Sequence, residues 1–425
     1  MTEQRVAADP IGWLGERLRE PYVQLVASQL LIGVVALAAN IMMVRALTPA
    51  HRGEVALLLQ VVYLATQALL LGTERSFVAA YHEVPPATAV RLYGRLLVAP
   101  ALLGVAAAAA YAMLAPSRLT PGPAVLALVT IFAIVEAASL ASRSVAIAAG
   151  RVHDFLASRV IESILLLAVM AVLFLARVDS PELWLGSYIV ACLAPTAGYV
   201  VYWLRLPGGA VSDENRLVRR QGVALFPAAI SNMAMLRSDR LALPALASTT
   251  ALGLYTAVAT MTELLAWPLR AYADSRLGRW RAAHRDGTLR TRPIVVAAVC
   301  YVLVAAPLVA GGLYLLIVPV FGEDYAPARA VVLPLVLAAG LYAVSRISLG
   351  LLVAKGHGTL VSAAEIAGFV VSFACYLLLI PGHGIAGAAW GSLIGYGAGL
   401  VFALITTRFA RDRISPSAAR EAGVS

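Results

Sequence analysis

The sequence predicts an all-α integral membrane protein with about 12 transmembrane helices. Of its 425 residues, 61% are hydrophobic and only 13% are charged. A water-soluble protein of this composition would expose more apolar surface than water tolerates. Apolar runs of about 20 residues, each long enough to cross a hydrocarbon core of about 30 Å, recur from one end of the chain to the other.

The predicted spans form two groups of six, separated by a polar cytoplasmic connector at 205–220. The N-terminal half, 24–204, has spans at about 24–47, 54–72, 94–115, 123–149, 156–176 and 182–204. The C-terminal half, 221–407, has spans at about 221–246, 251–272, 293–320, 328–353, 359–380 and 384–407.

A cytoplasmic segment, 1–23, precedes the first predicted span, and a cytoplasmic tail, 408–425, follows the last one. In the N-terminal segment Ile11, Leu14 and Leu18 share one helical face. This pattern fits a helix lying in the membrane interface, and a disordered tail is the alternative.

The distribution of Lys and Arg predicts that both termini are cytoplasmic, because cytoplasmic loops carry an excess of these residues. With the N-terminus inside, the inner segments hold 26 of the 33 Lys and Arg residues, and the outer loops hold 5. The five outer residues are Arg45, Arg52, Arg118, Arg177 and Arg329. The remaining two, Arg237 and Arg240, lie inside the seventh span.

A short sequence repeat in the first and seventh spans indicates two related halves. The first span ends Asn40-Ile-Met-Met-Val-Arg45, and the seventh contains Asn232-Met-Ala-Met-Leu-Arg237. A glycine opens the next helix in both halves, at Gly53 and Gly253. Repeats of this kind are typical of secondary transporters, whose binding sites lie between the repeats.

Polar residues inside the spans are the candidate substrate-binding residues, because a polar side chain that faces lipid is costly. Gln60, Gln67 and Glu74 recur every seven residues and form one stripe on the second span. The candidates that we expect to line a common cavity are Asn40, Gln60, Gln67, Asn232, Arg237, Asp239, Arg240 and Glu263. Three further charged residues, Glu136, Arg143 and Arg346, are interpreted as structural pairs or as inner-gate residues.

Arg237 and Arg240 have two readings. The planar guanidinium donates two parallel hydrogen bonds and suits phosphate, so the pyrophosphate of a polyprenyl-linked glycan fits them as a partner. Alternatively, both lie in the outer third of the seventh span, where Arg can extend to the interface and Asp239 would neutralise a neighbouring charge.

Motifs of enzymes and metal proteins do not occur in the sequence. There is no phosphate-binding glycine loop, no cluster of His or Cys with metal-ligand spacing and no nucleophile elbow. We therefore expect no enzymatic activity, no metal and no cofactor. An integral-membrane glycosyltransferase or polymerase is the enzymatic alternative, although such enzymes usually carry large loops and the loops here are short.

Gly387, Gly391, Gly395 and Gly399 recur every four residues in the last span. A stripe of small residues permits close helix contact. Packing inside the bundle is the favoured interpretation, and a dimer interface is the alternative.

Four stretches, in this order along the chain, carry a family resemblance. They are Arg52-Gly53; Asp239 followed by Leu252-Gly253-Leu254-Tyr255 and Ala257; Phe321-Gly-Glu-Asp-Tyr-Ala-Pro-Ala328; and Ile380-Pro-Gly-His-Gly-Ile-Ala-Gly-Ala-Ala389. With them the chain resembles the superfamily of multidrug, oligosaccharidyl-lipid and polysaccharide exporters, in particular its polysaccharide-flippase branch. The resemblance implies two six-helix bundles related by a pseudo-two-fold axis, a V-shaped central cavity and alternating access.

The resemblance also implies a function. We expect a flippase of the bacterial inner membrane that moves a lipid-linked oligosaccharide from the cytoplasmic to the outer leaflet. The expected partners are a polyprenyl-(pyro)phosphate-linked glycan, membrane lipids, and the glycosyltransferases and polymerase of glycan assembly, with no nucleic acid. The main alternative is a cation-coupled multidrug exporter. The drug exporters often carry an acidic residue in the first helix, whereas residues 25–47 contain neither Asp nor Glu.

Overall fold

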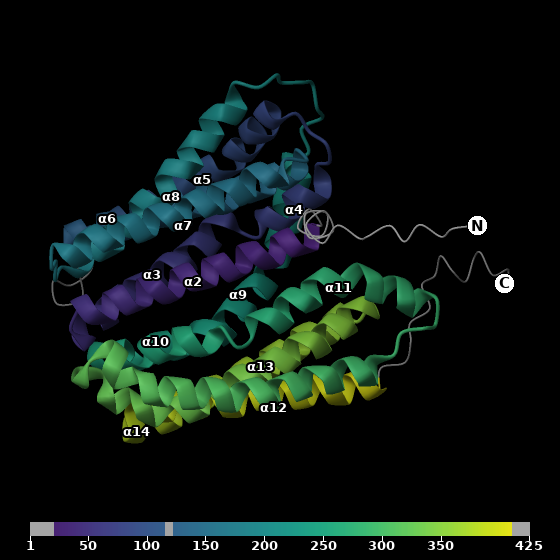
Figure 1. The fold of residues 1–425 in the computed structure, drawn as a ribbon. Coiled ribbons are helices and arrows are strands. Elements are labelled where there is room, and N and C mark those ends of the chain that lie inside the picture. Colours follow the sequence, from purple (N-terminus) through teal and green to yellow (C-terminus); the bar gives the residue numbers. More distant parts are fainter. Residues whose placement is uncertain (1–20, 115–121, 410–425) are drawn as a thin grey trace, which may run out of the picture.

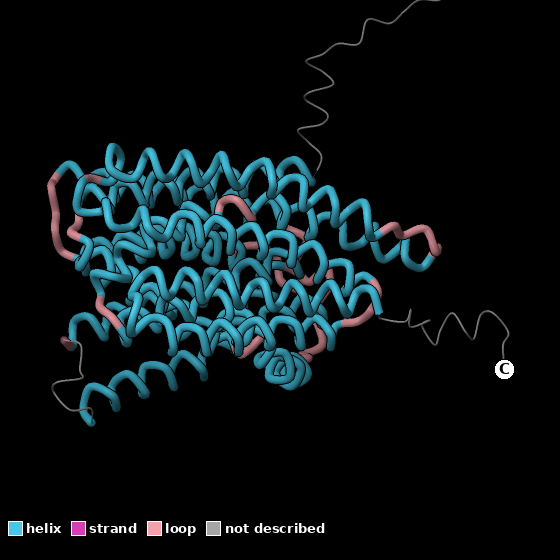
Figure 2. Tube along the Cα trace, turned by 90° about the horizontal axis from the view of Figure 1, so that it is seen from below, coloured by secondary structure: helices cyan, strands magenta, loops and turns pink. Residues whose placement is uncertain are grey.

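The computed structural model describes residues 21–114 and 122–409, and within these ranges the chain is helical with short connections and no strand. The helices form two groups that follow one another along the chain (Figure 1). Most of the long helices run along a common direction (Figure 2). The interfacial helix predicted around residues 11–18 and most of the predicted tail lie outside the described residues.

The helices of the N-terminal half are α2 (Pro21–Ala46), α3 (Pro49–Leu70), α4 (Thr73–Ala80), α5 (Pro86–Leu114), α6 (Pro123–Ala148), α7 (Val152–Leu175) and α8 (Pro181–Leu204). Those of the C-terminal half are α9 (Asn215–Leu246), α10 (Thr249–Glu263), α11 (Trp267–Arg285), α12 (Thr291–Leu316), η1 (Ile317–Phe321), η2 (Glu323–Ala328), α13 (Arg329–Ala354) and α14 (Gly358–Phe409). By length and composition, 8 of the described helical segments could cross a membrane. The architecture is consistent with the predicted layout of 12 spans in two bundles.

Several helices begin where the sequence provides a capping side chain. The hydroxyls of Thr48, Ser180 and Ser248 accept hydrogen bonds from backbone N–H groups in the first turns of α3, α8 and α10. Such a cap satisfies one of the four N–H groups that a helix leaves unpaired at its start. Proline follows the cap in α3 and α8, where its missing N–H has no consequence.

The second helix of each half is interrupted, and in the C-terminal half the break falls inside the continuous span predicted at 251–272. In the C-terminal half α10 ends at Glu263 and α11 begins at Trp267. Pro268 explains this break, because it has no N–H to donate to the carbonyl of Leu264 and its ring would clash with that carbonyl. In the N-terminal half Leu71 and Gly72 both adopt left-handed backbone angles between α3 and α4. Glu74 therefore lies on α4 and does not continue the polar stripe of α3.

α14 is a helical hairpin that supplies the last two predicted spans. The chain reverses at Gly384, whose φ of 52° and ψ of −126° are not helical. Gly391 lies against Tyr376, Gly395 against Ser372 and Gly399 against Gly368, so the two arms are antiparallel. The glycine stripe thus packs inside the bundle, as the favoured interpretation predicts.

The two halves meet where α3 and α10 cross at their N-terminal ends. A Cβ atom on Gly53 would overlap the carbonyl oxygen of Thr249, and a Cβ atom on Gly253 would overlap the carbonyl oxygen of Pro49. Each contact repeats the other with a shift of 200 residues, so the crossing lies on a local pseudo-two-fold axis. The echo of Gly53 and Gly253 in the sequence therefore corresponds to a direct contact between the halves.

The structure places the start of α2 and the end of α14 at the same end of the molecule (Figure 1). We predict that this end is cytoplasmic, because of the distribution of Lys and Arg. In a variant without the native cysteines, Ser248→Cys at the exposed start of α10 should react in intact cells with a membrane-impermeant thiol reagent. Asp286→Cys after α11 should react only once the membrane is opened. Labelling of Asp286→Cys in intact cells would reverse the predicted orientation.

Candidate functional site

A cavity of about 310 Å³ lies between the two halves. Its walls come from α2, α3, α6, α7 and α8 of the N-terminal half and from α9, α10 and α11 of the C-terminal half. Seven charged residues line it: Arg52, Glu136, Arg159, Glu162, Arg237, Arg240 and Glu263. Four basic and three acidic residues therefore line one space between the two halves.

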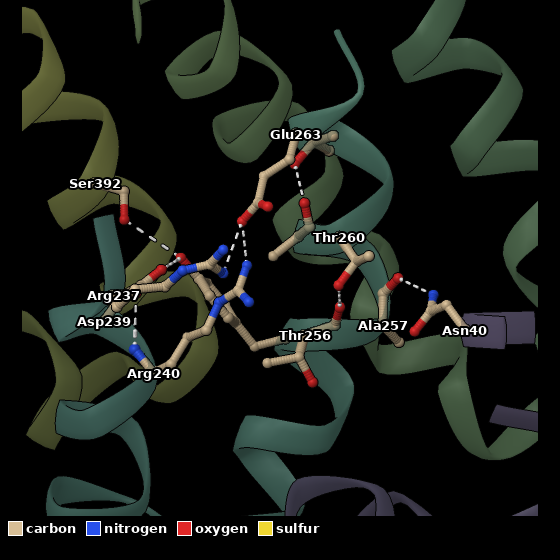
Figure 3. A network of polar contacts seen from close by, with 12 residues as sticks. Asn40, Arg237, Asp239, Arg240, Thr256, Ala257, Thr260, Glu263 and Ser392 are labelled. Atoms are coloured by element: carbon tan, nitrogen blue, oxygen red, sulfur yellow. Dashed lines mark hydrogen bonds and ion pairs between the residues drawn. The ribbon is translucent and has the colours of Figure 1, made fainter. Parts of the chain in front are cut away.

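One carboxylate holds both arginines of α9 (Figure 3). Glu263, the last residue of α10, forms an ion pair through its Oε1 with Nη2 of Arg240. The same oxygen, Oε1, lies 3.4 Å from Nη1 of Arg237. The end of α10 places Glu263 on the cavity, and the spacing of three residues brings both guanidinium groups to it.

The exposed fractions of these side chains bear on the second reading, in which both arginines extend to the membrane interface. The Arg240 side chain is 8% exposed and that of Arg237 is 24% exposed, and both line the central cavity. They point into the protein, so the reading in which they extend to the membrane interface does not describe this structure.

Asp239 forms no ion pair with either arginine side chain among the described residues. Its Oδ2 accepts a hydrogen bond from the Tyr255 hydroxyl at 2.6 Å, and its Oδ1 accepts one from the backbone N–H of Arg240 at 2.8 Å. Ser392 extends this network, because its hydroxyl lies 3.3 Å from that of Tyr255. Asp239 lines a second, smaller cavity of about 90 Å³ in the C-terminal half. Among the described residues the direct ion pairs of Arg237 and Arg240 are both made with Glu263.

Asn40 connects the two halves beside the cavity. Its Nδ2 donates to the carbonyl oxygen of Ala257 at 3.0 Å, and its Oδ1 accepts from Nη2 of Arg52 at 2.9 Å. Arg52 belongs to the first turn of α3, and only 4% of it is exposed. Its assignment to an outer loop is therefore wrong: it is a buried residue of the cavity wall.

The two glutamines of α3, Gln60 and Gln67, lie in different surroundings. Gln60 is buried and lines the central cavity, and its Oε1 has no hydrogen-bond partner among the described residues. Gln67, two turns further along, is half-buried and does not belong to the lining of this cavity. The side chain of Asn232 is not among those that the structure describes.

Glu136, interpreted from the sequence as part of a structural pair or as an inner-gate residue, lines this cavity, as do Arg159 and Glu162, which the sequence analysis did not single out. Arg159 and Glu162 form an ion pair at 2.6 Å on α7, and Glu136 on α6 lies 3.5 Å from the thiol of Cys192. All three are charged residues inside predicted spans, which is the signal that identified Glu136 and could have identified the other two. Arg346 pairs with Glu365 at 3.2 Å in the C-terminal half. Among the described residues, no group of three His, Cys, Asp or Glu side chains could hold a metal ion.

Comparison with known proteins identifies the fold. The sequence matches no protein-family model and no curated protein. The structure is similar to the inward-facing conformation of a multidrug resistance MATE family transporter of the MOP superfamily, with a TM-score of 0.67, 13% identity and coverage of 95% of this chain and 100% of that chain.

Two further solved structures have a similar fold. The inward closed conformation of the lipid II flippase MurJ has a TM-score of 0.64 and 10% identity, covering 91% of this chain and 87% of that chain. The MATE multidrug transporter DinF-BH has a TM-score of 0.62 and 13% identity, with coverage of 97% of this chain and 98% of that chain. The chain therefore has the fold that MATE transporters and MurJ share.

Proposed function

We propose that this protein is a flippase that moves a lipid-linked oligosaccharide from the cytoplasmic to the outer leaflet of a bacterial inner membrane by alternating access. The observation that carries the proposal is the pair of arginines, Arg237 and Arg240, that share one carboxylate in the central cavity. Two positive charges against one negative charge leave this cluster with a net positive charge. The cluster therefore favours an anionic substrate.

The chemistry of the cluster suits the phosphate groups of a polyprenyl-linked glycan. Each guanidinium offers several N–H donors in a fixed plane, and phosphate oxygens accept two of them at once. Glu263 occupies part of this donor set when no substrate is bound. A phosphate would compete with Glu263, so the carboxylate keeps the arginines in place without trapping the product.

The position of the cluster suits a transporter. It lies between two halves that touch at the α3–α10 crossing, where a rearrangement could open one side of the cavity and close the other. One solved structure with this fold is named a lipid II flippase, so the fold serves at least one flippase. The protein would act as a transporter and not as an enzyme, with membrane lipids around it and the glycosyltransferases and polymerase of glycan assembly as partners.

A cation-coupled multidrug exporter is the second candidate. The carboxylate of Glu136 faces the central cavity, and its hydrogen-bond partner among the described residues is the thiol of Cys192. A carboxylate without a positive partner suits an organic cation. The DinF-BH structure is named a multidrug transporter, so the fold also serves that function.

The double variant Arg237→Gln and Arg240→Gln tests the proposal. Each lost charged hydrogen-bond set costs about 1.5–3 kcal/mol, or roughly a ten- to hundredfold loss of affinity. We expect surface display of the glycan to fall at least about tenfold in a flippase-deleted host. Replacement of both residues by Lys should cause a smaller loss, because Lys keeps the charge and loses the planar donor set.

The matched control is Arg279→Gln with Arg281→Gln, which removes two exposed charges from α11. This control should display glycan normally at equal membrane abundance. Normal display from the Arg237–Arg240 variant at equal abundance would contradict the proposal. Efflux of ethidium, an organic cation, by the wild-type protein would, together with that result, favour the drug exporter.

A further inference from the structure

Arg52 is a buried cation without an acidic partner. Only 4% of the residue is exposed, and Arg52 is among the residues that line the central cavity. One nitrogen, Nη2, donates to Asn40, but Nε and Nη1 have no hydrogen-bond partner among the described residues. No carboxylate in the described part of the chain lies within ion-pair distance of it. Arg240, on the same cavity, has Glu263.

This arrangement is unfavourable as long as the cavity holds no anion. Burying a charge without a counter-charge costs several kcal/mol, even after relaxation and water entry. The helix adds to this cost, because Arg52 lies in the first turn of α3 and side chains lean toward the helix N-terminus. That end of a helix carries a partial positive charge, which favours anions over cations.

Asn40 holds the Arg52 guanidinium in one orientation. The amide of Asn40 is itself fixed, since it donates to Ala257 of the other half and accepts from Arg52. The remaining donors of Arg52 are therefore positioned before a ligand arrives. A preorganised donor set binds an anion without a large loss of side-chain entropy.

We propose that Arg52 and Asn40 form a second oxyanion subsite of the central cavity, distinct from the Arg237–Arg240 cluster. The ligand group is a phosphate or a carboxylate carried by the substrate, and both groups match the planar N–H donors of a guanidinium. The phosphate would belong to the lipid carrier, and the carboxylate would belong to an acidic sugar. The inference rests on the proposed function in one respect, that the substrate of this cavity is anionic.

The test is equilibrium binding of two probes, inorganic pyrophosphate and glucuronic acid, to the purified full-length protein. It compares the wild type with Arg52→Gln, with the Arg237→Gln, Arg240→Gln variant and with Arg177→Gln. Arg177 is an exposed arginine after α7 and serves as the matched control. We expect Arg52→Gln to weaken binding of one probe roughly ten- to hundredfold. Weaker binding of pyrophosphate by Arg52→Gln assigns the subsite to the carrier phosphate. Weaker binding of glucuronic acid assigns it to an acidic sugar.

Thermal unfolding without ligand separates this role from a structural one. Removal of an uncompensated charge should leave the unfolding temperature of Arg52→Gln equal to or above that of the wild type. A lower unfolding temperature with unchanged affinity for both probes would mean that Arg52 only supports Asn40, and would overturn the inference.

The binding results also separate the inference from the proposed function. If the Arg237–Arg240 variant binds pyrophosphate more weakly and Arg52→Gln binds both probes as the wild type does, the inference fails and the proposed function stands. If Arg52→Gln alone binds a probe more weakly, the subsite stands and the proposed role of the Arg237–Arg240 cluster fails. Absence of binding of both probes to the wild type would overturn both.

Discussion

Replacing Gly53 by Ala is expected to push α3 and α10 apart and to lower the stability of the protein by about 3 kcal/mol, the upper part of the usual range for an overpacked core. The new Cβ atom would overlap the carbonyl oxygen of Thr249. This oxygen belongs to the backbone, so no side-chain rotation can relieve the overlap. Favourable contacts need about 3.5 Å between heavy atoms, and the two helices would therefore have to separate.

The reciprocal change, Gly253→Ala, should have a similar effect, because its Cβ atom would overlap the carbonyl oxygen of Pro49. The control is Gly311→Ala in α12, where a Cβ atom would meet nothing within 4 Å. This control should not lower the unfolding temperature, since Ala favours a helix over Gly. Unfolding temperature and glycan display of the three variants provide the measurement. Wild-type values for Gly53→Ala would show that the halves do not close at this crossing.

Replacing Glu263 by Gln is expected to destabilise the protein and to strengthen its binding of pyrophosphate. The change removes the carboxylate that accepts from both Arg237 and Arg240. Breaking a buried ion pair by removing one partner costs about 3–5 kcal/mol. The Glu263 side chain is 40% exposed to the cavity, so water screens part of this loss, and we expect about 2–3 kcal/mol. Without the Glu263 carboxylate, a phosphate has no competitor for the N–H donors of the two arginines, so it should bind more tightly.

The second change Arg240→Gln, added to Glu263→Gln, should restore part of the unfolding temperature, because it removes the more buried of the two charges left without a partner. Glu323→Gln, at an exposed glutamate of η2, is the control and should change neither stability nor binding. If Glu263→Gln unfolds at the wild-type temperature, the ion pairs contribute nothing to stability. If it binds pyrophosphate more weakly than the wild type, the carboxylate is not a competitor of the phosphate.

The local pattern of the sequence determined the helical architecture. Apolar runs long enough to cross a bilayer can satisfy their backbone groups only as helices, and the predicted spans are helical apart from the break between α10 and α11. Capping residues such as Thr48 and Ser248 fixed where helices begin. The charges of Arg237, Arg240 and Glu263 were identified as candidates because a charge inside a span is costly unless it faces protein or water. All of these signals act over a few turns of one helix.

The tertiary structure alone decided how these charges are paired and which residues share the cavity. Glu263 is the counter-ion of Arg240 because the end of α10 lies beside α9, whereas Asp239, the immediate sequence neighbour, points to Tyr255. Arg52 resembled a loop residue in the sequence and is buried, because α3 crosses α10 beside it. The crossing of α3 and α10 joins residues about 200 positions apart. The spacing of residues along one helix does not show which residue of another helix will contact them. The sequence by itself therefore determined the helices and the charges they carry, and the packing of the two halves determined the cavity.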